Sequence, residues 1–519
     1  MKNKKTFFSI LGVELIIALF ILLKVPSLVE PNWYIDEGLY ATIAHYLINH
    51  VTLYKGVWDN KPPSIYFLFL ASRYFFSYQI LPLRILIFGL SAGTGILAIM
   101  LIKEWFENTK VGFYLLVLLA FVIMNSLFGN QVNGEVIFTF FTALSFFIVR
   151  RFHHTENFTP FLVAGFLMGI GISFKITAGL DALAYMMCFQ IFATTDYLKS
   201  RGWSIYRENL LHLGAYAIMC ITPLLLYLAY FVPRNAINDY LNALLFSNTA
   251  YVSYFNNTIF GVNTLLINSV VVILVLGILL YLYIAKKTTF FSELNAGSFF
   301  IIIWFVFDLY SILISGRAYY HYLLQPIIPA SILFAIVLYR VTVKKFILMC
   351  VVVFSFLFYF VRNVDLPQSL THSTEVQINY YGTIYGYLLG NVSQKELNSN
   401  FNVSDNGLNV NADNAITSYT NGLLGAGNNK IYMWANMPWV SAATNLTPVC
   451  KYIANFYISN DPGLQSETMS CLTKQMPEVI IDENSGYTFK ALSTLEQQHY
   501  HLARSFFVNT VRVYTLNET

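Results

Sequence analysis

Two short segments near the N-terminus carry acidic and basic residues that suit group-transfer chemistry. In the first, Asp36 and Glu37 stand where a helix is expected to begin. The apolar residues that follow have helical spacing and predict an amphipathic helix that lies on the membrane: Leu39, Ile43, Tyr46 and Leu47. Carboxylates at that position can cap the helix N-terminus. They can also provide a general base beside a second carboxylate. The two interpretations are compatible, and both stay open for Asp36 and Glu37.

The second segment, residues 58–63, reads WDNKPP. Pro62 and Pro63 are expected to hold Lys61 extended and then to begin a short helix, which fixes an ammonium group near the depth of lipid headgroups. An interfacial lysine often only extends its charge towards water. Phosphate binding is the alternative, since lysine binds phosphate as a point charge.

Further charged residues occur later in the chain, namely Glu135, Lys175 and the pair Arg317 and His321. The members of the pair are four residues apart, so on a helix they would share one face. The aromatic residues around them are typical of a belt at a membrane interface: Tyr319, Tyr320 and Tyr322. Taken together, cations suit a phosphate leaving group, and a carboxylate suits removal of a proton from an acceptor hydroxyl.

The elements that position these residues need a lipid bilayer as their solvent. Of the 519 residues, 56% are apolar and 11% are charged, which is more hydrophobic surface than a soluble domain of this length can bury. Apolar runs predict eleven membrane spans: 7–23, 81–102, 112–128, 136–149, 160–174, 177–195, 209–232, 263–284, 298–315, 322–339 and 346–361. Glu14, Asp181 and Asp308 fall inside spans, and each is expected to face protein or a water-filled cavity.

The distribution of basic residues predicts the orientation of these spans. With the N-terminus in the cytosol, the basic clusters between spans fall on the inner side. Residues 63–76 are apolar but form only a short run. A twelfth span there would place every later basic cluster on the outer side of the membrane. We therefore expect an interfacial or re-entrant helix inside a first outer loop of about residues 24–81. The same parity predicts a transmembrane domain, residues 1–361, and an extracytoplasmic α/β domain, residues 362–519, in a multi-pass protein. We expect the plasma membrane, and a membrane of the secretory pathway stays open, because the outer face of a cell and a secretory lumen are physically alike here.

This topology excludes several classes of function. No inner loop is long enough to be a nucleotide-binding domain, no Gly-rich phosphate loop follows a strand, and nothing predicts a nucleic-acid partner. A transferred group must then arrive through the lipid phase or from an external soluble donor. Among the cysteines, Cys188, Cys220 and Cys350 are expected to be small buried residues. Cys450 and Cys471 can form a disulfide if the tail lies outside the cytosol.

In their order and spacing, these segments resemble the polyprenyl-phosphate-sugar-dependent glycosyltransferases with the GT-C fold. That family includes the protein O-mannosyltransferases and the aminoarabinose transferases of lipid A. The resemblance covers most of residues 30–340 and rests on these motifs: Asp36-Glu37, Lys61-Pro62-Pro63, Asn133-Gly134-Glu135, the run from Gly165 to Gly169 that leads to Lys175, and residues 316–326. One departure is Ser64-Ile65-Tyr66, where relatives often carry leucine and then an aromatic pair, and it leaves the acceptor undefined.

The resemblance implies an inverting transfer of a hexosyl or pentosyl unit from a polyprenyl-phosphate carrier to a hydroxyl on the outer face. Asp36 would act as general base with Glu37 beside it, and some relatives bind a divalent metal near these acids, although none is assigned here. Four residues would hold the donor phosphate: Lys61 and Arg317 first, then Lys175 and His321. Glu135 and Tyr322 would orient the site or the acceptor, which could be a lipid, glycan, wall polymer or protein.

The polar tail resembles the family little. Its sequence predicts strands at 430–434 and 477–481, a helix at 488–503, a strand at 507–515, and a long loop or irregular β region at 391–429. Acceptor recognition, a lid and a spacer are all open roles for it. Three rival functions are a transporter or flippase of a lipid-linked or anionic substrate, a membrane scaffold, and a ligase that uses a pyrophosphate carrier.

Overall fold

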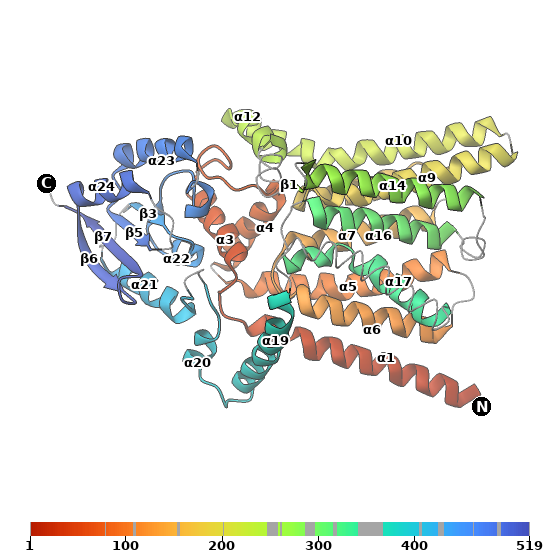
Figure 1. Ribbon diagram of the computed structural model, residues 1–519, viewed down its shortest axis with the longest axis horizontal. Coiled ribbons are helices and arrows are strands. Elements are labelled where there is room, and N and C mark those ends of the chain that lie inside the picture. The colour runs from red at the N-terminus through yellow and green to blue at the C-terminus, as the bar shows by residue number, and fades with distance from the viewer. Residues whose placement is uncertain are drawn as a thin grey trace. The chain divides into compact units, whose positions relative to one another are not determined.

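The protein folds into two compact units (Figure 1). The helical unit comprises Met1–Val25, Ile85–Ala229 and Phe246–Gln377, and the mixed unit comprises Pro26–Arg84, Tyr230–Leu245 and Ile378–Thr519. The computed structural model describes residues 2–77, 79–106, 110–152, 156–200, 202–246, 258–259, 262–285, 296–314, 319–340, 367–403, 407–423, 430–459, 461–484 and 489–517.

Long apolar helices make up the helical unit. They are α1 (Lys2–Lys24), α5 (Leu81–Trp105), α6 (Val111–Phe128), α7 (Gly134–Arg151), α8 (Thr159–Phe174), α9 (Ala178–Ser200), α10 (Trp203–Leu226), α14 (Thr264–Ala285), α16 (Ala296–Ile314) and α17 (Ile327–Arg340). Each of the first ten predicted spans overlaps one of these helices, although 209–232 runs past the end of α10 and 322–339 begins before α17. The eleventh, 346–361, lies outside the described residues.

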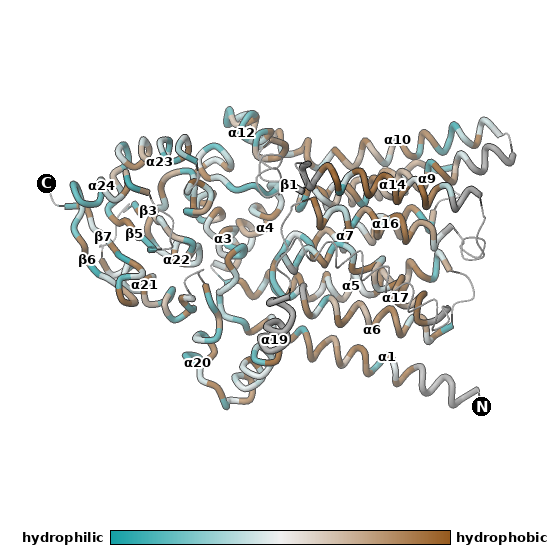
Figure 2. The backbone as a smooth tube through the Cα atoms, viewed as in Figure 1, coloured by the Kyte–Doolittle hydropathy of each residue, from teal (hydrophilic) through white to brown (hydrophobic). Residues whose placement is uncertain are grey.

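Four helical segments among the described residues are long and apolar enough to cross a membrane: Ile10–Val29, Leu81–Trp105, Trp203–Arg234 and Gly297–Ile314. Shorter apolar helices accompany them, and Figure 2 shows the hydrophobic residues that run along the helical unit. A helix satisfies all of its backbone hydrogen bonds internally, which a segment in lipid requires. The chain is an integral membrane protein.

Close packing of α8 against α10 explains the glycine run that the sequence singles out. A Cβ atom added at Gly165 would lie 2.3 Å from the carbonyl oxygen of Tyr216, and one at Gly169 would lie 2.5 Å from that of Cys220. Small residues four apart let the backbones of membrane helices approach each other. The run therefore fixes the end of α8, which immediately precedes Lys175.

The three acids inside predicted spans differ in their surroundings. Asp181 on α9 and Asp308 on α16 are fully buried, as expected, and both accept hydrogen bonds from the amide of Gln325, at 2.8 and 3.4 Å. The side chain of Glu14 lies on the exposed face of α1, so this chain does not itself surround Glu14 with protein. Helical spacing places Glu14 on the face of α1 that projects away from the rest of the helical unit.

The mixed unit contains a five-stranded sheet. Its strands are β3 (Lys430–Trp434), β4 (Thr447–Pro448), β5 (Val479–Glu483), β6 (Tyr500–Phe506) and β7 (Val511–Leu516), in the order β4-β3-β5-β7-β6. The strands β4, β3 and β5 are parallel, whereas β7 pairs antiparallel with both β5 and β6. Thus the predicted α/β domain forms around a mixed sheet.

Both faces of this sheet are covered. Along β5, Val479 and Ile481 enter one hydrophobic core while Ile480 enters the other. That alternation is what the two-residue repeat of a strand produces. The covering helices and short elements are α19 (Pro367–Leu388), which begins in the helical unit, α20 (Gln394–Ser399), α21 (Val410–Leu423), α22 (Pro438–Ala443), η4 (Asn455–Tyr457), α23 (Pro462–Gln475) and α24 (Lys490–His499).

Some boundaries predicted for the tail were wrong. Within 391–429 the described residues form the helices α20 and α21, and the capping box of Ser393 and Glu396 begins the first of them. The predicted helix 488–503 ends at His499, because the chain then enters β6, and the last strand begins at Val511.

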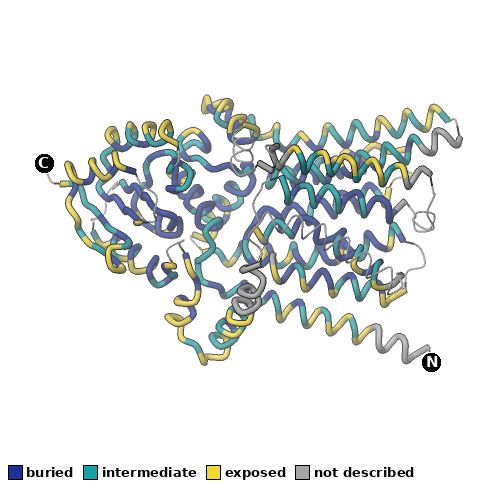
Figure 3. The backbone as a smooth tube through the Cα atoms, in the orientation of Figure 1, coloured by how far each residue is buried: buried dark blue, intermediate teal, exposed yellow. Residues whose placement is uncertain are grey.

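The first outer loop folds as part of the mixed unit. Its main elements are α3 (Ile35–Ile48) and α4 (Pro63–Phe76), which begins with its prolines as predicted. We expected the apolar face of α3 to lie on the membrane, and this was wrong, because these residues are buried against α4 and α22: Leu39, Ile43, Tyr46 and Leu47. Figure 3 shows the burial along the backbone.

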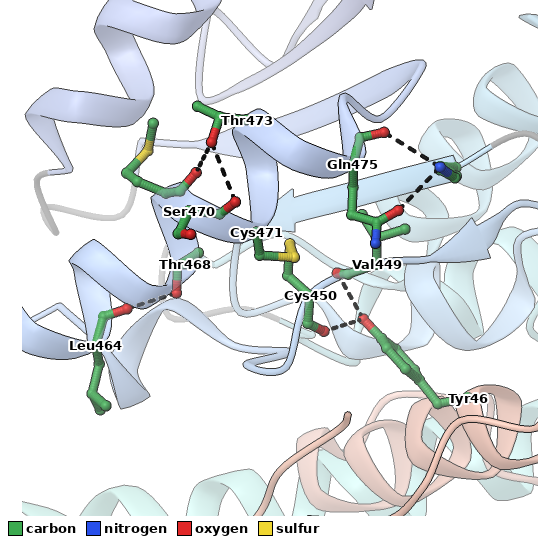
Figure 4. Close-up of a disulfide and its surroundings, with 11 residues drawn as sticks. Tyr46, Val449, Cys450, Leu464, Thr468, Ser470, Cys471, Thr473 and Gln475 are labelled. Carbon is green, nitrogen blue, oxygen red and sulfur yellow. Dashed lines mark hydrogen bonds between the residues drawn. A yellow bond between two sulfur atoms is a disulfide. The ribbon is translucent and has the colours of Figure 1, made fainter. Parts of the chain in front are cut away.

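Polar contacts fasten α3 to the tail across almost 400 residues of sequence. The hydroxyl of Thr42 donates to the carbonyl oxygen of Pro438 at 2.7 Å. The hydroxyl of Tyr46 donates to the carbonyl oxygens of Val449 and Cys450, both at 3.0 Å, as Figure 4 shows. Cys450 and Cys471 are joined in a disulfide, which settles the pairing that the sequence left open. The first outer loop and the tail therefore form one packed unit.

Candidate active site

Glu37, the second acid of the first outer loop, is fully buried and ion-paired. Its carboxylate lies 3.2 Å from the guanidinium of Arg84 on α5, which is buried as well. Arg84 also donates to the carbonyl oxygens of Glu30 and Pro31. An ion pair that is closed in this way holds the start of α3 against α5 and leaves Glu37 poorly placed to accept a proton.

Asp36 differs from its neighbour. It stands in the first turn of α3, is partly exposed, and accepts one long hydrogen bond, 3.4 Å, from the hydroxyl of Tyr34. Successive residues of a helix point about 100° apart, so Asp36 does not follow Glu37 into the protein. Asp36 is thus an accessible carboxylate that could take a proton from a hydroxyl group.

The pair Asp36 and Glu37 does not suit a divalent metal. Glu37 already binds Arg84, which leaves one carboxylate for a cation that prefers six or more oxygen ligands. Among the residues that the structure describes, no three His, Cys, Asp or Glu side chains are grouped so that they could hold a metal ion. The residues present therefore give no support to a metal at this position.

Lys61 precedes the two prolines that begin α4. Its ammonium group donates to the side-chain oxygen of Asn60 at 3.0 Å. Its backbone is held on both sides, because its N–H donates to the hydroxyl of Tyr66 at 3.1 Å and its carbonyl oxygen accepts from Tyr54 at 2.6 Å. The side chain is partly exposed, so the segment presents a cation from a fixed backbone.

In the helical unit, four predicted site residues come together. Glu135 in the first turn of α7 forms an ion pair with Lys175, which follows α8, and the imidazole of His321 lies 3.6 Å from the same carboxylate oxygen. The ammonium group of Lys175 also lies 3.9 Å from the ring centre of Tyr322. His321 and Tyr322 belong to the short helix η3 (Tyr320–Leu324).

A buried polar network supports that cluster. Gln325, next to η3, donates to the carbonyl oxygen of Thr177 at 3.2 Å as well as to Asp181. The hydroxyl of Thr142 donates to Asp181 at 3.0 Å. These bonds tie the segment after Lys175 to the segment that carries His321. Asp181 thus has a structural role in holding the cluster in shape.

The predicted site residues fall into two sets. Asp36, Glu37 and Lys61 belong to the mixed unit, and Glu135, Lys175, His321 and Tyr322 belong to the helical unit. Arg317 lies outside the described residues.

Sequence reasoning missed several residues that shape the site. Arg84 could have been found, because it is a basic residue inside an apolar run at the end predicted to face outwards. The roles of Tyr54, Tyr66 and Tyr457 could not be predicted, because a single sequence does not show which of its 36 tyrosines make hydrogen bonds to buried groups.

Comparison with known proteins agrees with these observations. A profile of the family described as dolichyl-phosphate-mannose-protein mannosyltransferase matches residues 60–227, a range that includes Lys61, Glu135 and Lys175. No curated protein sequence matches the chain.

Solved structures show the fold. ArnT from Cupriavidus metallidurans in the apo state is similar with a TM-score of 0.57 and 15% identity, and ArnT bound to undecaprenyl phosphate with 0.56 and 14%; both alignments cover 98% of each chain. The archaeal oligosaccharyltransferase AglB from Archaeoglobus fulgidus, in complex with an inhibitory peptide and a dolichol-phosphate, gives 0.48 and 11%, covering 99% of this chain and 75% of that one. The predicted resemblance to the GT-C glycosyltransferases is confirmed at the level of fold.

Proposed function

We propose that the protein is an inverting glycosyltransferase that moves a sugar from a polyprenyl-phosphate carrier to a hydroxyl acceptor on the extracytoplasmic face of the membrane. The observation that carries this proposal is the contrast at the start of α3, where Glu37 is closed in an ion pair and Asp36 remains accessible. The ArnT-like fold and the profile match from residue 60 onwards support the same choice.

In the proposed reaction Asp36 removes the proton of the acceptor hydroxyl as its oxygen attacks the anomeric carbon. The bond from that carbon to the phosphate oxygen breaks, and the electron pair leaves with the polyprenyl phosphate. General-base catalysis of this kind contributes about 100- to 10,000-fold to a rate. Attack opposite the leaving group inverts the configuration of the sugar.

The developing charge on the phosphate needs cations. Lys61 and Arg317 are the proposed primary ligands, and Lys175 and His321 would assist. Because Lys175 is paired with Glu135 in the structure, a phosphate would have to share that ammonium group with the carboxylate. Glu135 and Tyr322 therefore act in this scheme by orienting Lys175. Each charge-assisted hydrogen bond to phosphate would contribute about 1.5–3 kcal/mol.

The proposed orientation has the N-terminus in the cytosol and the tail outside, in the plasma membrane. The positive-inside pattern supports it, and so does the disulfide, since disulfides persist in oxidising compartments. The sugar, a hexose or a pentose, and the acceptor class stay unassigned. Asp181 is hydrogen-bonded within the bundle, which removes one of the acids that a transporter function would have used.

The test uses purified full-length protein in detergent with undecaprenyl- and dolichyl-phosphate sugars. Wild-type protein should gain thermal stability with a carrier, and the Lys61→Ala/Arg317→Ala variant should not. Asp36→Asn should keep that gain and lose transfer to a hydroxyl acceptor. A fully active Asp36→Asn enzyme would remove the assignment of the base, and the absence of any shift in wild type would favour a transporter or a scaffold.

A further inference from the structure

The segment that follows β4 in the C-terminal domain contacts the first outer loop next to Lys61. We name residues 449–458 the cystine loop, because Cys450 joins it to Cys471 on α23. Figure 4 shows this disulfide beside the hydroxyl of Tyr46, which donates to the carbonyl oxygens of Val449 and Cys450. This first contact fixes the beginning of the cystine loop against α3.

A second contact joins the cystine loop to Trp58, three residues before Lys61. The N–H of Trp58 donates to the carbonyl oxygen of Lys451 at 2.8 Å. The indole ring then packs edge-on against two phenol rings of the cystine loop, with centroids 5.9 Å from Tyr452 and 5.1 Å from Tyr457. The backbone entering the WDNKPP segment is thereby paired with the C-terminal domain.

The third contact reaches Asp59, a carboxylate that is only 1% exposed. The hydroxyl of Tyr457 donates to Oδ1 of Asp59 at 2.5 Å, and that of Tyr66 donates to Oδ2 at 2.8 Å. Oδ1 also accepts from the N–H of Asn60 at 2.6 Å. The negative charge of Asp59 is thus held by phenols from two parts of the chain, one of which is the cystine loop.

Tyr66 connects the carboxyl group of Asp59 to the backbone of Lys61. Its hydroxyl donates to Asp59 and accepts from the N–H of Lys61, so one phenol joins the carboxylate to the backbone of the cation. Burial is the main cause that raises the pKa of Tyr66 well above its ordinary value, so the phenol keeps its proton for Asp59. A fixed backbone leaves only the side chain of Lys61 to be ordered when an anion binds.

We propose that Tyr457 is a positioning residue for anion binding by Lys61, and that the Cys450–Cys471 disulfide keeps Tyr457 in place. The C-terminal domain then acts as part of the donor site, through the chain of contacts from the cystine loop to Asp59, Tyr66 and Lys61. This inference rests on the proposed function, in which Lys61 binds the carrier phosphate.

The first experiment measures binding of undecaprenyl phosphate to full-length protein in nanodiscs. Tyr457→Phe removes one hydroxyl and should raise the Kd about tenfold, the loss expected for one hydrogen bond to a charged group. The matched control is Tyr500→Phe, which removes a buried hydroxyl that donates to the carbonyl oxygen of Pro477 at 2.9 Å within the same domain. The control should bind as wild type does. Equal Kd values for the two variants would overturn the proposal.

A double-variant cycle separates positioning from general stability. In Lys61→Ala the anion contact is gone, so adding Tyr457→Phe should not raise the Kd further. A purely structural role would make the two losses multiply, which would contradict the proposal even if Tyr457→Phe alone binds weakly. With a sugar-loaded donor, Tyr457→Phe should raise KM and leave kcat at saturating donor near wild type.

The cycle also distinguishes the two hypotheses. If Lys61→Ala binds undecaprenyl phosphate as wild type does, the phosphate role of Lys61 is wrong, and the positioning proposal fails with it. If Lys61→Ala binds weakly but Tyr457→Phe does not, only the positioning proposal fails.

The second experiment addresses the disulfide. The Cys450→Ser/Cys471→Ser variant, and wild type treated with a reducing agent, should both show the Kd of Tyr457→Phe. Reduction of Tyr457→Phe should then have no additional effect. A reduced wild-type protein, with its free thiols confirmed by mass spectrometry, that binds as tightly as the oxidised protein would show that the disulfide does not hold Tyr457.

Discussion

The acids of the first outer loop and the acid of the helical unit are stabilised in different ways. In the loop, Glu37 is closed in an ion pair with Arg84, and its neighbour Asp36 has one long bond from Tyr34. In the helical unit, Glu135 is ion-paired with Lys175 and lies close to His321. One region therefore offers an accessible carboxylate, and the other offers a lysine that is already paired with a carboxylate.

This difference indicates a division of labour. An accessible carboxylate can accept a proton, whereas a carboxylate paired with a lysine sets the position of that ammonium group. Burial accounts for the difference between these carboxylates, because a buried charge requires a partner, whereas a partly exposed charge does not. The behaviour of Asp36, Glu37, Glu135 and Glu30 should then follow from the partners of each carboxyl group.

The largest effect is expected at Asp36. Asp36→Asn should lower kcat by about 100- to 10,000-fold, since an amide cannot act as a base, while thermal stability stays close to wild type. The comparison variant is Glu135→Gln, measured by the same radiolabelled-sugar transfer assay. It should retain more activity than Asp36→Asn, and a more severe loss at Glu135 would reverse the two roles.

Glu37 should matter for stability instead. Glu37→Ala leaves the guanidinium of Arg84 buried without its carboxylate, and breaking a buried pair in this way costs about 3–5 kcal/mol. A lower midpoint of thermal unfolding and a lower yield of folded protein would show this. Glu37→Leu/Arg84→Met removes both charges and should recover most of the loss. If the double variant is stable but as inactive as Asp36→Asn, then Glu37 takes part in the chemistry.

The sequence predicted well those parts of the fold that depend on composition and on the periodicity of apolar residues. Ten predicted spans correspond to helices, and the bounds of α4 and β3 were predicted, because apolar runs and prolines act locally. The helices α20 and α21 were missed, since Asn-rich sequence carries a weak helical pattern and tertiary packing decides such cases.

For the site, sequence could propose residue types but not partners. Asp36 and Glu37 are adjacent, and their residue types left the same two interpretations open for both; the pairing of Glu37 with Arg84 distinguishes them in the structure. The pairing of Glu135 with Lys175 joins residues 40 apart, and that of Asp59 with Tyr457 joins residues 398 apart. Contacts at such separations depend on the whole fold, so no local pattern reveals them.

Glu30, another buried acid of the first outer loop, can be tested through the dependence of stability on pH. Burial raises the pKa of Glu30 to about 7, although Arg84, Tyr380 and Trp33 act against the rise. The folded protein then holds a proton that the unfolded chain loses near pH 4.5, so stability should fall as the pH rises from about 4.5 to 7, by about 3 kcal/mol in all. Glu30→Gln cannot ionise and should show a flatter dependence of the unfolding midpoint on pH over that range. An unchanged slope would mean that Glu30 is ionised in the folded protein.

The smallest effect is expected at Lys175, where stability and function have to be separated. Lys175→Met leaves Glu135 buried with His321 as its one remaining ion-pair partner in the part of the chain that the structure describes, so the unfolding midpoint should fall, and the donor KM should rise about tenfold because one charge-assisted bond is lost. Lys175→Met/Glu135→Gln removes the uncompensated charge and should restore the midpoint but not the KM. Lys175→Arg keeps the cation and should lie between Lys175→Met and wild type in both measurements. If the double variant recovers the KM as well, Lys175 serves only to neutralise Glu135, and the phosphate must be held by Lys61 and Arg317 without it.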